Sequence, residues 1–210
     1  MLDSLRANVP FEEFDYQVLL DSLRHYAAPR DRITRLIETG AIVRVKKGLY
    51  VFGPTYRRQP LSLELLANLV SGPSYVSFEY ALASYGLVPE GVKTLTSACF
   101  GKARVFDTPV ARFSYRPVPR HVFALGMTLV GSRPDRTYLM ASREKALCDT
   151  IVTSRRLAAR SARALRTALA DDLRVDMDLL RTLDATSVRS LAVQWPSRRL
   201  ALLAEVIAHE

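Results

Sequence analysis

The feature that most restricts the fold is a change of hydrophobic period at Gly40. Before it, Ile33, Leu36 and Ile37 recur at the spacing of one helix face. After it, residues 41–52 (AIVRVKKGLYVF) read as two short strands around a Lys-Lys-Gly turn. A glycine is the usual helix stop because it accepts the left-handed conformation without strain. The pattern predicts a helix over residues 30–39 that runs directly into a β-hairpin.

Another helix is predicted just before this one. Asp15 can cap a helix over residues 16–23, and residues 26–29 (YAAP) then interrupt it. The order helix, short turn, helix, hairpin predicts a winged helix-turn-helix over residues 1–58. Polar and basic residues ending in a proline, 55–60, are the expected linker.

The rest of the chain, residues 59–210, is predicted to form a larger mixed α/β domain with a mostly helical end. We expect a helix over residues 62–69 capped by Ser62, one over 77–85 closed by Gly86, one that Ser142 opens over 142–149, and further helices within 160–208. We expect strands over residues 93–100, 111–115, 126–130 and 137–141. The predicted fold class is α+β, with domains 1–58 and 59–210.

Charge narrows the choice of partner. The chain has 30 lysine and arginine residues against 21 aspartate and glutamate residues, a formal net charge of +9. This excess of positive charge favours a polyanionic binding partner, either nucleic acid or an anionic membrane surface. No apolar signal-peptide core and no apolar run of ~18 residues is present, and the two cysteines lack metal-ligand spacing. We expect a cytoplasmic monomer without metal or cofactor.

The predicted second helix supplies the first candidate contacts. Its solvent face would carry charged residues opposite the apolar stripe: Asp31, Arg35 and Glu38, flanked by Arg32 and Thr34, with Arg30 in the first turn. In a helix-turn-helix this face enters the major groove, where arginine suits guanine or phosphate and threonine suits a thymine methyl group or the backbone. The alternative is a solvated amphipathic helix with an Asp31–Arg35 ion pair.

The predicted hairpin adds a basic tip directly after that helix. Lysines at such a tip often only prevent edge pairing, but clustering with neighbouring arginines favours contact with DNA phosphates. The predicted DNA-binding residues are Arg30, Arg32, Thr34, Arg35, Arg44, Lys46, Lys47, Arg57 and Arg58.

Several segments together resemble AbiEi-type antitoxins, over roughly residues 10–155. They are residues 33–40 (ITRLIETG), 43–50 (VRVKKGLY), 60–64 (PLSLE), 72–82 (GPSYVSFEYAL) and 142–149 (SREKALCD). The resemblance implies a DNA-binding transcriptional autorepressor of a bacterial type IV toxin–antitoxin, or abortive-infection, system. It would bind inverted repeats in its own promoter and antagonise a nucleotidyltransferase-like toxin, with direct contact left open. Stand-alone members also occur.

The rival hypothesis is a nucleic-acid-processing enzyme that docks through the winged helix. Its metal would need carboxylates from separate elements, for which Glu79, Asp107, Glu144 and Asp149 are the candidates. No metal-ligand motif or phosphate loop is present, so we expect no catalysis. In the same helix we interpret Lys145 as a solvated lysine.

Three further features have alternative interpretations. Cys148 is more typical of a small core residue than of a nucleophile. Tyr75, Phe78 and Tyr80 fit a packed core better than a base-stacking platform. A basic run (Arg155, Arg156, Arg160, Arg163 and Arg166) predicts a helical stripe that is solvated surface, a second DNA contact or a face for an acidic partner.

Overall fold

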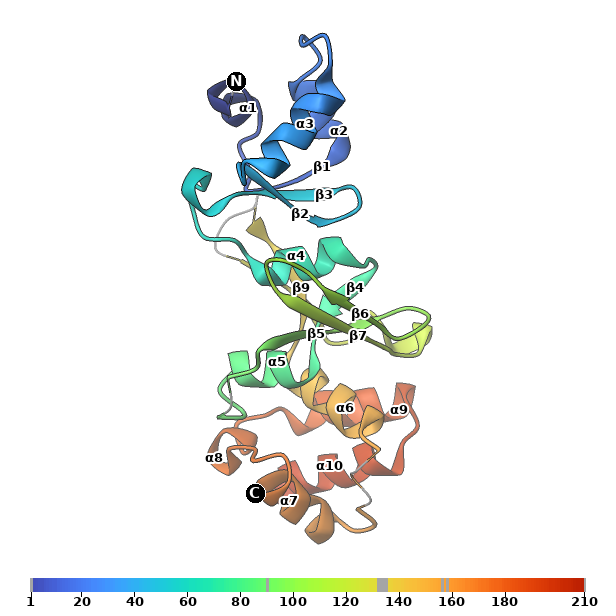
Figure 1. The fold of residues 1–210 in the computed structure, drawn as a ribbon. Helices are drawn as coiled ribbons and strands as arrows, with labels where there is room; N and C mark the ends of the chain where they lie inside the picture. Colours follow the sequence, from blue (N-terminus) through green and yellow to red (C-terminus); the bar gives the residue numbers. More distant parts are fainter. Residues whose placement is uncertain (1, 90, 132–135, 156, 158, 210) are drawn as a thin grey trace.

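The computed structural model describes residues 2–89, 91–131, 136–155, 157 and 159–209. It has an α+β fold in which two units lie end to end along an elongated molecule (Figure 1). The N-terminal unit contains α1 (Leu2–Asn8), β1 (Glu13–Asp15), α2 (Tyr16–Ser22), α3 (Pro29–Glu38), β2 (Ile42–Lys46), β3 (Leu49–Phe52) and η1 (Pro54–Tyr56). The predicted helix, helix and hairpin are therefore present in the predicted order.

Local sequence signals set the ends of these elements. The Asp15 carboxylate accepts a hydrogen bond from Val18 N over 2.8 Å and caps α2. Pro29 occupies the first turn of α3, where its missing N–H costs nothing. Gly40 follows α3 with φ of +68°, as its stop position requires. The sheet order is β1-β3-β2, and β1 is a strand that the sequence did not predict.

The two faces of β3 belong to different cores. Tyr50 and Phe52 pack in the core of the N-terminal unit. Leu49 and Val51, which alternate with them, pack in the core of the larger unit. Packing is thus continuous across the predicted linker, because the hairpin lies between the two cores (Figure 1).

The larger unit is built on a six-stranded mixed sheet of order β6-β7-β5-β4-β9-β8. Its elements are α4 (Leu63–Val70), β4 (Ser74–Val76), α5 (Phe78–Ser84), β5 (Thr94–Cys99), β6 (Arg104–Asp107), β7 (Arg112–Pro117), η2 (Arg120–Val122), β8 (Met127–Val130), β9 (Tyr138–Ala141), α6 (Arg143–Thr153), α7 (Ala162–Asp171), α8 (Met177–Leu180), α9 (Ala185–Gln194) and α10 (Arg198–His209). Helix α4 covers the face toward the N-terminal unit, and α5 and α6 cover the other (Figure 1).

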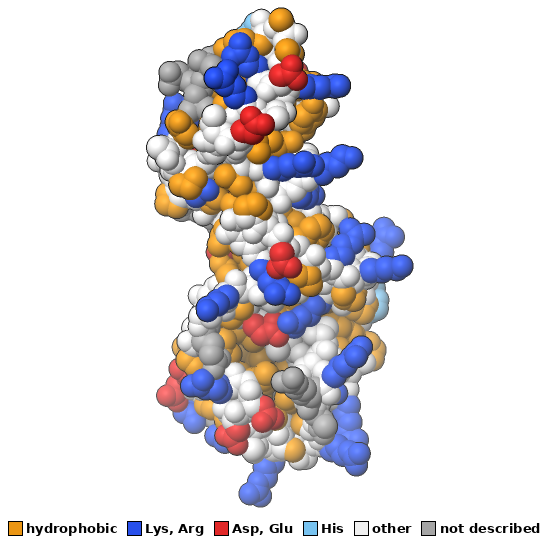
Figure 2. Space-filling model, viewed as in Figure 1, with side chains coloured by type: hydrophobic (Ala, Val, Ile, Leu, Met, Phe, Trp, Pro, Cys, Tyr) orange, Lys and Arg blue, Asp and Glu red, His pale blue; other side chains and the backbone are white. Residues whose placement is uncertain are grey.

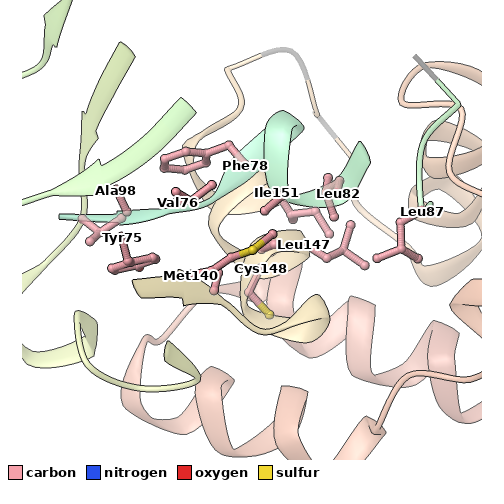
Figure 3. Close-up of a cluster of buried hydrophobic side chains, with 14 of the residues drawn as sticks. Tyr75, Val76, Phe78, Leu82, Leu87, Ala98, Met140, Leu147, Cys148 and Ile151 are labelled. Atoms are coloured by element: carbon pink, nitrogen blue, oxygen red, sulfur yellow. The ribbon is translucent and has the colours of Figure 1, made fainter. Parts of the chain in front are cut away.

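The centre of the larger core is where β4 meets α5 and α6. Figure 3 shows Tyr75, Val76 and Phe78 in one cluster of buried side chains with Leu147 and Ile151 of α6. The predicted serine caps are confirmed at α4 and α6, where serine hydroxyls accept backbone N–H groups. Strands β4 and β6 and helix α1 were not predicted as separate elements.

One helical prediction is wrong. Helix α7 begins at Ala162, so Arg160 precedes it and does not share a helical face with Arg163. Arg156 lies outside the described residues. Ser161 caps α7 by accepting a hydrogen bond from Ala164 N, and this cap fixes the helix start two residues beyond Arg160.

Among the described residues no helix has both the length and the apolar character needed to cross a bilayer.

Candidate nucleic-acid interface

Helix α3 presents a charged face to solvent. Ile33 and Leu36 are buried against β2, β3 and α2. The exposed residues are Arg30, Asp31, Thr34, Arg35 and Glu38. The opposite-face assignment made from the 100° helical step is therefore confirmed, and Arg35 lies on this face in the last turn of the helix.

Two of the predicted contacts on α3 have partners within the unit. Arg32 is half-buried, and its guanidinium carbon lies 4.8 Å from the centroid of the Tyr26 ring. The Thr34 hydroxyl donates to Arg30 O over 3.2 Å. Arg32 thus helps to fix the segment between α2 and α3. Thr34 has its hydroxyl turned back onto the helix, a geometry that leaves its methyl group as the part free for contact.

The hairpin register places its basic residues on opposite faces of the sheet. Arg44 pairs with Tyr50 and therefore shares the face on which α3 packs. An irregularity follows, after which Lys46 pairs with Leu49 on the face toward the larger unit. There Lys46 Nζ donates to Val70 O of α4 over 2.6 Å. Lys46 is therefore directed away from the α3 side.

Lys47 lies at the turn itself and is exposed. The next residue, Gly48, has φ of +87°, and a side chain there would be strained. Arg44 is also exposed. Arg44 on the side of α3 and Lys47 at the turn are thus the exposed basic groups of the hairpin, whereas Lys46 is directed toward the larger unit.

Arg57 and Arg58 lie at the opposite end of β3 from the turn. Arg57 Nε donates to Phe52 O over 2.8 Å, at the last residue of the strand. The backbone N–H of Arg58 donates to the buried Glu12 carboxylate, and the Arg58 side chain is exposed. Eight of the nine predicted residues therefore form two groups, one comprising the α3 residues with Arg44 and Lys47, and the other, Arg57 and Arg58, lying around η1. Lys46 belongs to neither group, because it is bonded to Val70 O of α4.

The larger unit contains a buried polar cluster made of Tyr75, Ser77, Lys145 and Asp149, which was not predicted from the sequence. Lys145 is fully buried, so its interpretation as a solvated lysine is wrong. Its Nζ lies 2.8 Å from Asp149 Oδ1, one helical turn along α6. Asp149 Oδ2 accepts hydrogen bonds from Tyr75 and Ser77, over 2.9 and 2.7 Å. The i, i+4 spacing of the lysine and aspartate was the available signal.

This cluster is electrostatically costly. Burial raises the pKa of Asp149, against the opposing effect of the Lys145 ammonium. The Lys145–Asp149 contact is an ion pair, and among the described residues neither Nζ nor Oδ1 has a further hydrogen-bond partner. Lys145 Nζ also lies 5.0 Å from the Trp195 ring centroid. The cluster joins β4, α6 and the segment after α9, so its visible role is to hold these elements together.

The carboxylates proposed for a metal site each have a separate partner. Glu79 pairs with Arg116, and Asp107 pairs with Arg112. Glu144 accepts from Ser142 Oγ and from the backbone of Asp184, while Asp149 lies in the buried cluster. Within the described ranges no three His, Cys, Asp or Glu residues are grouped to hold a metal ion.

Two interpretations of core residues are confirmed. Cys148 is buried, and burial raises the pKa of its thiol, so it is a packing residue. Tyr75 and Phe78 are fully buried and cannot stack on a base, and Tyr80 is half-buried against the same core. Comparison of the chain with protein-family models finds no match, and comparison with curated proteins finds none either.

Proposed function

We propose that the N-terminal unit is a winged helix that binds double-stranded DNA, with α3 in the major groove and the β2–β3 turn beside the adjacent phosphate backbone. The observation that carries the proposal is the solvent face of α3, with Arg30, Thr34 and Arg35 exposed along a helix whose opposite face is buried. In a winged helix this is the face that meets base edges. Arg35, in the last turn of α3, is the candidate for a bidentate guanine contact.

The hairpin supports the same orientation. Arg44 lies on the sheet face that packs against α3, and Lys47 projects at the turn. Cations there would contact phosphates and supply affinity that does not depend on base sequence. Figure 2 shows Lys and Arg side chains projecting from the N-terminal unit, in keeping with the chain's net charge of +9.

On the sequence resemblance to AbiEi-type antitoxins, we propose further that the chain represses its own operon and antagonises a nucleotidyltransferase-like toxin. The partners would then be promoter DNA with inverted repeats and the toxin of the neighbouring gene. Co-expression of that gene with and without the chain tests the antitoxin role. Growth arrest relieved by the chain supports it, and arrest that persists contradicts it.

A titration tests DNA binding itself. The purified chain is titrated against the duplex upstream of its gene and against a scrambled duplex of equal length, at low and moderate salt. We expect tighter binding to the upstream duplex and weaker binding to both duplexes at the higher salt. Equal affinity for the two duplexes would contradict a role for α3 in reading sequence.

A further inference from the structure

Phe100 is an aromatic side chain that the fold leaves open to solvent. It follows β5 directly and is 38% exposed, in contrast to the fully buried Tyr75 and Phe78. Its ring packs on Phe123, with centroids 4.1 Å apart. This support holds the ring at the surface in a defined place, so a planar ligand would meet it without much loss of side-chain freedom.

The loop that carries Phe100 is short and tightly turned. Cys99 Sγ donates to Lys102 O over 3.8 Å, and Gly101 has φ of +81°. The backbone N–H of Val118 donates to Cys99 O, so the segment after β7 runs beside this loop. That segment brings the Arg120 guanidinium to 5.9 Å from the centroid of the Phe100 ring.

Three cations come from the segments that meet at this loop: Lys102 from the loop itself, Arg104 from the start of β6, and Arg120 from the segment after β7. Lys102, Arg104 and Arg120 are all exposed, and among the described residues none has an acidic partner within ion-pair distance. Arg112 and Arg116 on the neighbouring strand are different, because Asp107 and Glu79 neutralise them. Figure 2 shows basic side chains gathered beside a histidine on the right-hand side of the larger unit. We call Phe100, Lys102, Arg104 and Arg120 the basic aromatic patch.

We propose that the basic aromatic patch binds single-stranded nucleic acid, with one base stacked on Phe100 and the flanking phosphates contacted by the three cations. Proteins that bind single strands combine an aromatic ring with nearby cations. The ring can stack on any base, because every base has a stacking face, and the cations contact the phosphates. A duplex hides its base faces inside the stack, so it would gain from the cations but not from Phe100. This favours a single strand over a duplex. The proposal goes beyond duplex binding by α3 and does not depend on it.

The test uses the intact chain and labelled oligonucleotides of about twelve nucleotides, oligo-dT and oligo-U, with a random duplex for comparison. Binding is followed by fluorescence anisotropy over a range of salt. Three phosphate contacts predict a slope of log affinity against log salt of about −2 for single strands. Equal binding of the two oligomers would indicate recognition of base and phosphate alone. Tighter binding of oligo-U would add contact with the 2′-hydroxyl, and either result supports the proposal.

Phe100→Leu removes the stacking face and keeps an apolar side chain against Phe123. We expect about tenfold weaker binding of single strands and unchanged binding of the duplex. Phe11→Leu is the matched control, since Phe11 is 45% exposed on the N-terminal unit, and it should change neither. Lys102→Ala should reduce the single-strand salt slope by about 0.7.

An α3 variant separates this proposal from duplex recognition. Arg35→Ala should weaken binding of the duplex upstream of the gene and leave single-strand binding as it is in the parent chain. The proposal is overturned if the parent chain does not bind the oligomers, or if Phe100→Leu binds them as tightly as the parent does. It is also overturned if Phe100→Leu weakens the binding of single strands and the binding of the duplex to the same extent, because the ring would then have no stacking role.

Discussion

Lys46 Nζ of the hairpin donates a hydrogen bond to Val70 O of α4 over 2.6 Å. The contact joins the two units through Lys46, which was predicted from the sequence to be a DNA-binding residue. Its neighbour Lys47 has the same charge and lies exposed at the turn. Adjacent lysines therefore have different surroundings, because the register of the hairpin turns Lys46 toward the larger unit.

Substitution of these two lysines should give opposite results. Lys46→Met should lower the free energy of unfolding by about 1 kcal/mol, since it loses the bond to Val70, and leave the salt dependence of DNA binding unchanged. Lys47→Met should leave the free energy of unfolding unchanged and reduce the salt slope by about 0.9, the value of one phosphate contact. Urea denaturation and anisotropy titrations measure the two quantities. The same phenotype from both variants would contradict the assignment.

The buried ion pair on α6 predicts strong coupling between its members. Lys145→Met or Asp149→Asn alone should each lower the free energy of unfolding by about 3–5 kcal/mol, because the remaining charge stays buried without its partner. The double variant should cost clearly less than the sum of the two single changes. Additive losses in urea denaturation would show that the two groups do not act as a pair.

Gly53 closes the junction between the hairpin and the end of α3. A Cβ atom there would lie 1.9 Å from Gly40 O, while the backbone N–H of Gly53 already donates to Ala41 O. Gly53→Ala should therefore lower the free energy of unfolding by about 1–3 kcal/mol. Gly91→Ala is the control, because that position faces open space, and it should change stability by less than about 0.5 kcal/mol. Equal thermal stability of the two variants would refute the close approach.

Glu13 should make stability depend on pH. Burial raises the pKa of its carboxyl above 4.5, although Ser62 N–H and the Arg136 guanidinium act in the opposite direction. The folded state then holds the proton more tightly than the unfolded state, so the stability from Glu13 is fully present at low pH and is lost as pH rises through the folded pKa. We therefore expect the free energy of unfolding of the parent chain, minus that of Glu13→Gln, to fall as the pH rises above 4.5. A difference that grows with pH would contradict this.

Period and capping signals were sufficient to predict the main helices and the hairpin. Asp15, Gly40 and Ser62 act locally, so their effect can be read without knowing the fold. The strands β1 and β4, of three residues each, are too short to show a period, and only pairing with distant strands defines them.

The candidate site was predictable only in part. Exposure of Arg35 follows from helix geometry alone. The direction of Lys46 depends on a strand irregularity and on α4, 24 residues away, and neither leaves a local signal. Burial of Lys145 likewise depends on Tyr75, Asp149 and Trp195, which only the folded chain brings together.

Sequence reading by α3 is tested most directly by one ratio, the affinity for the upstream duplex divided by that for the scrambled duplex. It is measured for the parent chain, Arg35→Ala and Lys47→Ala at one salt concentration. We predict that Arg35→Ala lowers the ratio about tenfold, since a bidentate guanine contact contributes about 1–3 kcal/mol of discrimination. Lys47→Ala should weaken binding of both duplexes equally and leave the ratio unchanged. A ratio that Arg35→Ala does not alter would contradict the placement of α3 in the major groove.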